Sequence, residues 1–225
     1  IFAGLLVSVI FGFSFLFTKE ALDNIQAFHL LGFRFACAFI VLTLLKVMGL
    51  IKINFKGKSL NLLFLLALFQ PVAYFIFETL GLKLSTASEA GMMIALIPVV
   101  VAILATIFLA EPPSKKQVVF IITSVVGVIL IIFMKSNTDF SSDTTGLFLL
   151  LGAVISAGIY NILSRKSSLE FNSIEITYIM MSIGALFFNG VSLMRHYSNG
   201  QLANYFAPLA TKDVLIAVLY LGILS

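Results

Sequence analysis

Long apolar runs alternate with short polar clusters along the chain. Each run is close to the roughly 20 residues that an α-helix needs to cross the hydrocarbon core of a bilayer. The pattern therefore predicts seven membrane-spanning helices and the start of an eighth, at residues 1–18, 27–48, 60–82, 87–110, 117–134, 146–164, 173–194 and 212–225.

Three of these runs begin with the residue types of a capping box. In a capping box the first side chain, and a Glu or Gln three residues later, satisfy free backbone N–H groups of the first helical turn. The three pairs are Thr86 with Glu89, Ser114 with Gln117, and Asn172 with Glu175. The connections are short except for residues 196–211, whose aromatic residues predict a segment at the membrane interface or a partner-binding loop.

The composition agrees with this pattern, since 60% of the residues are hydrophobic and 11% are charged. Soluble domains and disordered chains lie far from these values, and a single cysteine, Cys37, excludes a disulfide scaffold. The net charge of +4 is scattered between the apolar runs, so we expect no nucleic-acid partner. The chain is predicted to be an all-α polytopic membrane protein surrounded by the lipid bilayer.

Lys and Arg residues are unevenly shared between alternate loops, with eight on one side and five on the other. Cytoplasmic loops carry an excess of these residues. We therefore predict a multi-pass protein of the cell membrane, the inner membrane in a bacterium, with its N-terminus in the cytoplasm.

An internal repeat is suggested by a shift of 146 residues, which aligns residues 12–19 with residues 158–165. A glycine begins and a cation ends both stretches, although a chance match between apolar helices is the alternative. We interpret residues 1–145 as a first five-helix repeat and residues 146–225 as a second, incomplete repeat of about three helices. An odd number of helices per repeat inverts the second one, as in many secondary transporters, and a full second repeat would extend to about residue 291. We therefore expect a truncated chain.

Three stretches then carry the pattern of a known family: residues 11–19, residues 29–38 and, most specifically, residues 81–127 with Pro98 and Glu111. They resemble the EamA-type branch of the drug/metabolite transporter superfamily. The resemblance implies a ten-helix fold of two inverted five-helix repeats, a central cavity and secondary transport of small metabolites. In two respects the chain departs from the family pattern, because Phe120 stands in place of a small residue and the last two helices are absent.

Lys19, Arg34 and Glu78 are ionisable residues inside or at the ends of apolar runs, where charges are costly. The predicted orientation places all three near the outer surface. Our hypothesis is an ion-pair cluster that lines the cavity, in which Arg34 or Lys19 binds an anionic substrate group. Ion pairs or snorkelling that only orient the helices are the alternative, and proton coupling through Glu78 is a second one.

Polar residues gather on one face of the third predicted helix, where Gln70, Tyr74, Glu78 and Gly81 follow helical spacing. Ser14 on the first helix and Tyr160 on the sixth complete the predicted substrate cavity. Hydroxyl groups in membrane helices often bond the carbonyl four residues back, so a structural role is the alternative for Ser14.

Pro71 and Pro98 lie inside the third and fourth apolar runs. A proline in a helix frees a carbonyl one turn back and permits a kink. We predict that the two kinks act in gating, with a static bend as the alternative.

Enzyme chemistry has little support, because the chain lacks the common nucleotide-binding, hydrolase and metalloprotease motifs. His29 and His196 are far apart near span ends, and no cluster has metal-ligand spacing, so we expect neither a metal nor a cofactor. The predicted function is a secondary transporter that moves small organic metabolites, amino-acid-like or drug-like, by alternating access. A non-transporting membrane scaffold or a dimerising fragment is the alternative, and a homodimer is left open.

Overall fold

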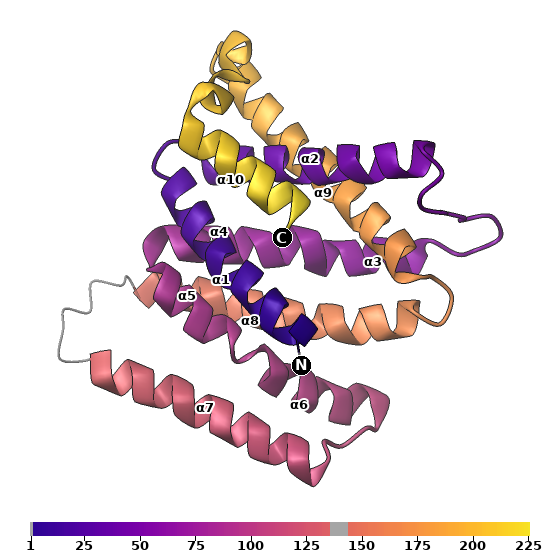
Figure 1. Ribbon diagram of the computed structural model, residues 1–225, viewed down its shortest axis with the longest axis vertical. Coiled ribbons are helices and arrows are strands. Elements are labelled where there is room, and N and C mark those ends of the chain that lie inside the picture. Colours follow the sequence, from indigo (N-terminus) through magenta and orange to yellow (C-terminus); the bar gives the residue numbers. More distant parts are fainter. Residues whose placement is uncertain (1, 136–143) are drawn as a thin grey trace. The chain divides into compact units, whose positions relative to one another are not determined.

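The computed structural model describes residues 2–135 and 144–225, and every regular element in these ranges is a helix (Figure 1). The longer helices are α1 (Phe2–Ala21), α2 (Ala27–Val47), α3 (Asn61–Ala67), α4 (Tyr74–Leu84), α5 (Ala87–Ile94), α6 (Ile97–Leu109), α7 (Lys115–Lys135), α8 (Thr144–Ser167), α9 (Ser173–Ser198) and α10 (Lys212–Ile223). Three shorter segments are η1 (Leu68–Ala73), η2 (Leu202–Asn204) and η3 (Ala207–Ala210).

Each of the eight predicted apolar runs contains helix in the described residues, with ends that differ by a few residues from the prediction, and the runs at 60–82 and 87–110 are interrupted. Within the described ranges, five stretches are long and apolar enough to cross a membrane: Ala27–Val47, Asn61–Leu84, Ala87–Leu109, Thr145–Ser167 and Ser173–Ser198. A sixth is added if Leu202–Ala210 and Lys212–Ile223, which meet at a bend of 88°, count as one span. The predicted fold class, an all-α polytopic membrane protein, is confirmed.

The three predicted capping boxes are also confirmed. The backbone N–H of Thr86 donates to Glu89 Oε2 at 2.8 Å, and that of Glu89 donates to Thr86 Oγ1 at 3.2 Å. The Ser114 and Asn172 boxes show the same reciprocal pattern. Such bonds are predictable because they join residues three apart in the chain.

Two of the apolar stretches are interrupted. Between α3 and α4 the chain passes through η1, where Gln70 has the extended backbone angles φ −146° and ψ 116° and is followed by Pro71. Between α5 and α6 the helix stops at Ile94 and resumes at Ile97, with Pro98 in the first turn of α6. Both breaks lie beside the prolines that the sequence singled out.

The chain divides into two compact units, one made of Ile1–Val72 and Ser167–Ser225 and the other of Ala73–Lys166. These units do not coincide with the predicted repeats, residues 1–145 and 146–225, so the repeat boundary stays a prediction. Residues 136–143, at the end of the predicted first repeat, lie outside the described residues.

In the first unit, α2 packs along α9, and α10 packs against both α1 and α2 (Figure 1). A buried apolar cluster joins α1, α2 and α10 with the connection before α10, and it is made of Ala21, Ile25, Leu30, Phe33, Tyr205, Val214, Ala217, Val218 and Leu221. A Cβ on Gly32 would lie 2.8 Å from the side-chain Oδ1 of Asn189 and 3.3 Å from its backbone N. Gly32 therefore permits the close contact of α2 with α9 that small residues in membrane helices allow.

In the second unit, α8 makes close contacts with α4 and α6 through glycines. A Cβ on Gly81 of α4 would lie 2.8 Å from Leu150 of α8, and one on Gly158 of α8 would lie 2.5 Å from Val100 of α6. A Cβ on Gly152 would lie 3.2 Å from the ring of Phe77. These glycines therefore permit close packing of α8 against its neighbours.

Candidate functional site

Lys19 and Arg34, two of the predicted cavity cations, both lie in the first unit. Lys19 is half-buried in the last turn of α1. Arg34 is buried in α2, its Nη2 donates to Ser225 Oγ at 3.3 Å, and its guanidinium carbon lies 5.8 Å from the ring centre of Phe35. A buried guanidinium needs such partners because an unpaired charge in an apolar interior is costly.

Glu78, the predicted anionic partner, lies in α4 of the second unit. It is 4% exposed, and its Oε2 accepts a hydrogen bond from Thr79 Oγ1 at 3.1 Å. Since Lys19 and Arg34 belong to the other unit, the ion-pair cluster of the three residues stays a prediction.

The face of α4 that carries Glu78 is buried. Tyr74, Glu78 and Gly81 share it with helical spacing, and Gly81 contacts α8. Gln70 does not continue this face, because its extended backbone breaks the helix before Tyr74. The i to i+4 relation that we predicted from Gln70 to Tyr74 is therefore wrong, for the physical reason that helical spacing applies only within a continuous helix.

The remaining predicted cavity residues are partly buried or buried. Gln70 and Tyr160 are half-buried, and Tyr74 packs at a right angle to the ring of Phe75, 4.8 Å between centres. Ser14 is buried, and its hydroxyl donates to the carbonyl of Ile10 at 2.8 Å. This is the hydrogen bond to the carbonyl four residues back that the structural alternative for Ser14 describes.

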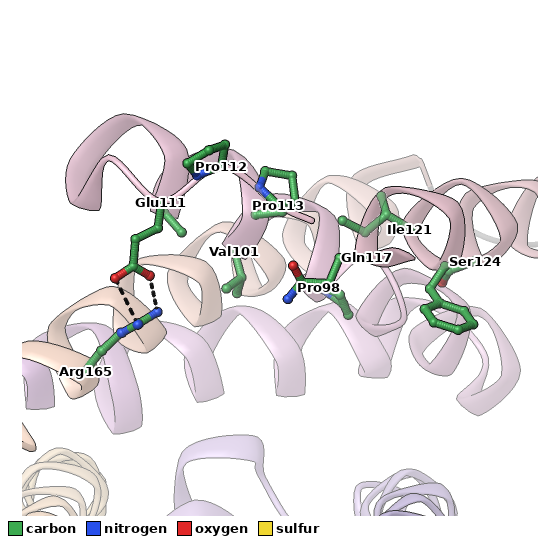
Figure 2. A pocket seen from close by; sticks show the side chains of 12 residues that line it. Pro98, Val101, Glu111, Pro112, Pro113, Gln117, Ile121, Ser124 and Arg165 are labelled. Atoms are coloured by element: carbon green, nitrogen blue, oxygen red, sulfur yellow. Dashed lines mark hydrogen bonds and ion pairs between the residues drawn. The ribbon is translucent and has the colours of Figure 1, made fainter. Parts of the chain in front are cut away.

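A groove of about 460 Å³ lies in the second unit between α6, the connection after it, and α7 (Figure 2). Its lining is mostly apolar and includes Pro98, Val101, Phe120 and Ile121. Figure 2 shows Glu111 and Arg165 facing each other at one end of the groove. Arg165 Nη2 donates to Glu111 Oε1 at 2.9 Å, and Nη1 lies 2.5 Å from Oε2, so the pair is bidentate.

The break between α5 and α6 is bridged at this groove. Ser124 Oγ of α7 donates to the carbonyl of Ala95 at 3.3 Å, within the two residues that separate α5 from α6. A side chain on a neighbouring helix thus satisfies a carbonyl at the break, as is needed in an apolar environment. Pro98, predicted to act in gating, therefore lines a groove and lies next to a supported break.

Two polar clusters escaped the sequence analysis. His29 and His196 meet at one end of α9, with their ring centres 4.7 Å apart. At the other end, Lys58 Nζ lies 2.6 Å from Glu175 Oε2. A usable signal existed for the histidines, because the predicted orientation places both at the outer ends of their spans.

Comparisons with known proteins bear directly on this arrangement. The model of the EamA-like transporter family matches residues 1–133 and 144–225. The chain belongs to the EamA-like transporter family. It is 37% identical over 223 residues to "Uncharacterized transporter YcxC" of Bacillus subtilis (strain 168), an alignment that covers 99% of this chain and 72% of that protein. It is 28% identical over 222 residues to an "Uncharacterized transporter" of Archaeoglobus fulgidus, covering 97% of this chain and 73% of that protein.

Membership of the EamA-like transporter family confirms the resemblance seen in the sequence, and it points to a transporter and away from an enzyme. Phe120, which departs from the pattern that the resemblance implied, is 72% exposed and lines the groove. Glu111, one of the residues that carried the resemblance, closes one end of the same groove with Arg165.

Proposed function

We propose that this EamA-like protein is a secondary transporter that moves small organic metabolites, amino-acid-like or drug-like, across the cell membrane by alternating access. The observation that carries the proposal is the interruption of two apolar spans, at Gln70 in Asn61–Leu84 and between Ile94 and Ile97 in Ala87–Leu109. Broken helices at membrane depth are tolerated where protein or a water-filled cavity surrounds them, and transporters use them to bind substrates.

Pro71 and Pro98 act as hinges in this proposal. Each lies directly after a break in a span, so a change in the backbone at the break tilts one half of the span against the other. The bond from Ser124 to the carbonyl of Ala95 ties the second break to α7 in the described conformation. A hinge needs such a replaceable bond, since a carbonyl freed by movement has to find a new partner.

The substrate contacts in this proposal are polar side chains of the spans. Ser14, Lys19, Arg34, Gln70, Tyr74 and Glu78 lie in or near the predicted outer half, and Tyr160 lies in the predicted cytoplasmic half. Arg34 carries the strongest case, because it is a buried cation inside an apolar helix. Ionisable residues at such depth mark substrate or ion pathways in many membrane proteins. We assign Arg34 to an anionic substrate group and Glu78 to the balance of its charge.

Alternating access requires two gates, which an inverted repeat supplies. The separate matches of the family model to residues 1–133 and 144–225 support a repeat with a boundary near residue 145. In this proposal the N-terminus lies in the cytoplasm, as the distribution of Lys and Arg indicates.

Flux into proteoliposomes tests the proposal. The full chain is reconstituted and offered a panel of radiolabelled amino acids, nucleosides and amphipathic cations. We expect saturable uptake of at least one compound, and a loss of about tenfold or more in its apparent affinity for Arg34→Ala, because a charge-assisted hydrogen bond contributes about 1.5–3 kcal/mol.

Two further variants make the result specific. Arg34→Lys keeps the charge and should retain part of the uptake, whereas Lys52→Ala, at an exposed loop position, should leave uptake unchanged. Equal uptake by Arg34→Ala and by the unchanged chain would contradict the assignment of Arg34 to the substrate site. If no compound of the panel shows saturable flux, the non-transporting scaffold becomes the better reading.

A further inference from the structure

An aromatic cluster encloses two imidazole rings where α2 begins and α9 ends. His29 lies in the first turn of α2, and its ring centre is 4.4 Å from that of Tyr205, 4.4 Å from that of Phe33 and 4.7 Å from that of His196. The rings of His196 and Tyr205 are 5.3 Å apart. We call His29 and His196 the histidine pair.

Tyr205 ties the segment Leu202–Ala210 to the histidine pair and to the two long helices. Its hydroxyl donates to Asn189 Oδ1 at 2.6 Å, and Asn189 Nδ2 donates to the carbonyls of Gly32 at 2.8 Å and Ala185 at 2.7 Å. Tyr205 is 4% exposed and belongs to the apolar cluster that joins α2 and α10. Tyr205 therefore contributes both hydrogen bonding and apolar packing to the docking of this segment, beside the stacking of Phe206 on Phe33.

The hydrogen bonds of the histidine pair show where a proton can bind. His196 Nδ1 lies 2.8 Å from the carbonyl of Ser192, and a carbonyl only accepts, so Nδ1 carries the hydrogen. In the neutral ring Nε2 of His196 then has a free lone pair. His29 is 2% exposed, and within the described part of the chain its Nε2 has no hydrogen-bond partner.

We propose that the histidine pair is a proton-binding site and that uptake of one proton releases the segment Leu202–Ala210 from α2 and α9. With both rings neutral, the cluster is held by ring packing and by the bonds of Asn189. A proton adds a positive charge and a second N–H donor to a buried ring. When the cluster opens, water hydrates the positive charge and accepts a hydrogen bond from the added N–H.

The balance of energies favours release. A buried imidazolium is unfavourable here, because the N–H added at Nε2 of His29 has no acceptor among the described residues, and contact with the rings of Phe33 and Tyr205 returns only part of the free energy lost on leaving water. His196 is the titratable group that acts on His29, and the backbone of Tyr205 forms a hydrogen bond with the His29 ring. The Tyr205 side chain, whose ring also contacts His29, is neutral near pH 7. Two imidazolium rings at this distance repel each other, so the pair binds one proton before it opens.

The position of the histidine pair along the spans indicates from which side of the membrane the proton comes. Both histidines lie at span ends that the distribution of Lys and Arg assigns to the outer side. The proton then comes from outside the cell membrane, and acidification there loosens the segment.

The chain suits a direct test, because it contains two histidines in all. The full chain is labelled with ¹⁵N-histidine and titrated in lipid nanodiscs from about pH 8 to about pH 5, the range in which imidazoles change charge. We expect the two histidine signals to titrate together, as a coupled pair does. Over the same range, amide hydrogen exchange in Leu202–Ala210 should rise at least tenfold relative to His29→Phe measured at the same pH.

His29→Phe keeps an aromatic ring in the cluster and cannot bind a proton, so comparison at equal pH cancels the intrinsic pH dependence of exchange. Tyr197→Phe, at a tyrosine that is 73% exposed, should keep the wild-type acid response. Independent titration of the histidines, or equal acid-induced exchange in wild type and His29→Phe, would overturn the proposal.

A second variant covers the case in which His29→Phe does not fold. His196→Gln removes the neighbouring charge, so the remaining histidine, His29, should change its titration midpoint. An unchanged midpoint would show that the two rings do not act as a pair and would equally reject the proposal.

Discussion

The two ends of α9 hold buried polar side chains in opposite ways. At the first turn, Glu175 is 2% exposed and its carboxylate accepts from Lys58 Nζ at 2.6 Å, from the N–H of Asn54 at 3.0 Å and from the N–H of Asn172 at 3.1 Å. At the last turn, the buried His29 packs beside His196, and its Nε2 has no hydrogen-bond partner among the described residues.

Glu175 and His29 are equally buried, and the difference between them lies in their hydrogen-bond partners. Glu175 joins a capping box to an ion pair, so movement of the connection that carries Asn54 and Lys58 leaves a buried carboxylate with fewer partners. Such a loss is costly. The histidine end has no comparable bond at His29 Nε2 to lose, so it is the end that we expect to open.

The largest effect on stability should come from removing the carboxylate of Glu175, in the first turn of α9. Glu175→Ala leaves the N–H of Asn54 and the Lys58 ammonium without this acceptor and abolishes one half of the capping box. We expect the free energy of unfolding to fall by about 3 kcal/mol. Thermal unfolding in detergent measures it, with the exposed Glu170→Ala as the matched control. Equal melting temperatures for the two variants would contradict the comparison.

A smaller loss of stability is expected from a change near the last turns of α9, where Asn189 binds Tyr205. Asn189→Ala leaves the hydroxyl of Tyr205 and the carbonyl of Gly32 without this partner, which should cost about 1–2 kcal/mol. Hydrogen exchange should increase in Leu202–Ala210 and stay unchanged near Glu175. Asn161→Ala is the control, because Asn161 donates to the carbonyl of Ala157 in its own helix. An increase of exchange at both ends of α9 would show that the ends are not independent.

The smallest effect on stability should come from removing the charge of Lys58, the cation that pairs with Glu175. Lys58→Met keeps an unbranched side chain near the ring of Phe171 and removes the charge that contacts Glu175. Because the Lys58 side chain is 28% exposed, solvent screens the pair, and we expect a loss of about 0.5–1 kcal/mol. The exposed Lys56→Met serves as the reference. A loss as large as that of Glu175→Ala would mean that the ion pair, and not the capping box, holds this end.

Parts of the fold were predictable from the sequence because they depend on residues close together in the chain. The Asn172 capping box joins residues three apart, and the apolar runs mark the helices by composition alone. The breaks beside Pro71 and Pro98 follow from the missing N–H and the rigid ring of proline.

The candidate site was less predictable. Helical spacing placed Gln70 on the face of Tyr74 and Glu78, but the break at Gln70 interrupts the helix that the spacing assumed. The groove was not predicted, although two residues that carried the family resemblance, Pro98 and Glu111, line it. Spacing identifies a face, but it does not reveal which element packs against that face.

By itself, the sequence determined that this protein consists of apolar helices, where most of these helices begin, and which family it resembles. Those properties arise from hydropathy and from contacts within one helical turn. The tertiary structure alone decided that Glu111 pairs with Arg165, that Lys58 pairs with Glu175, and that His29 meets His196. Each of these contacts joins different helices or the loops beside them, and helix packing, through close approaches such as that of Gly32 to Asn189, sets which residues meet.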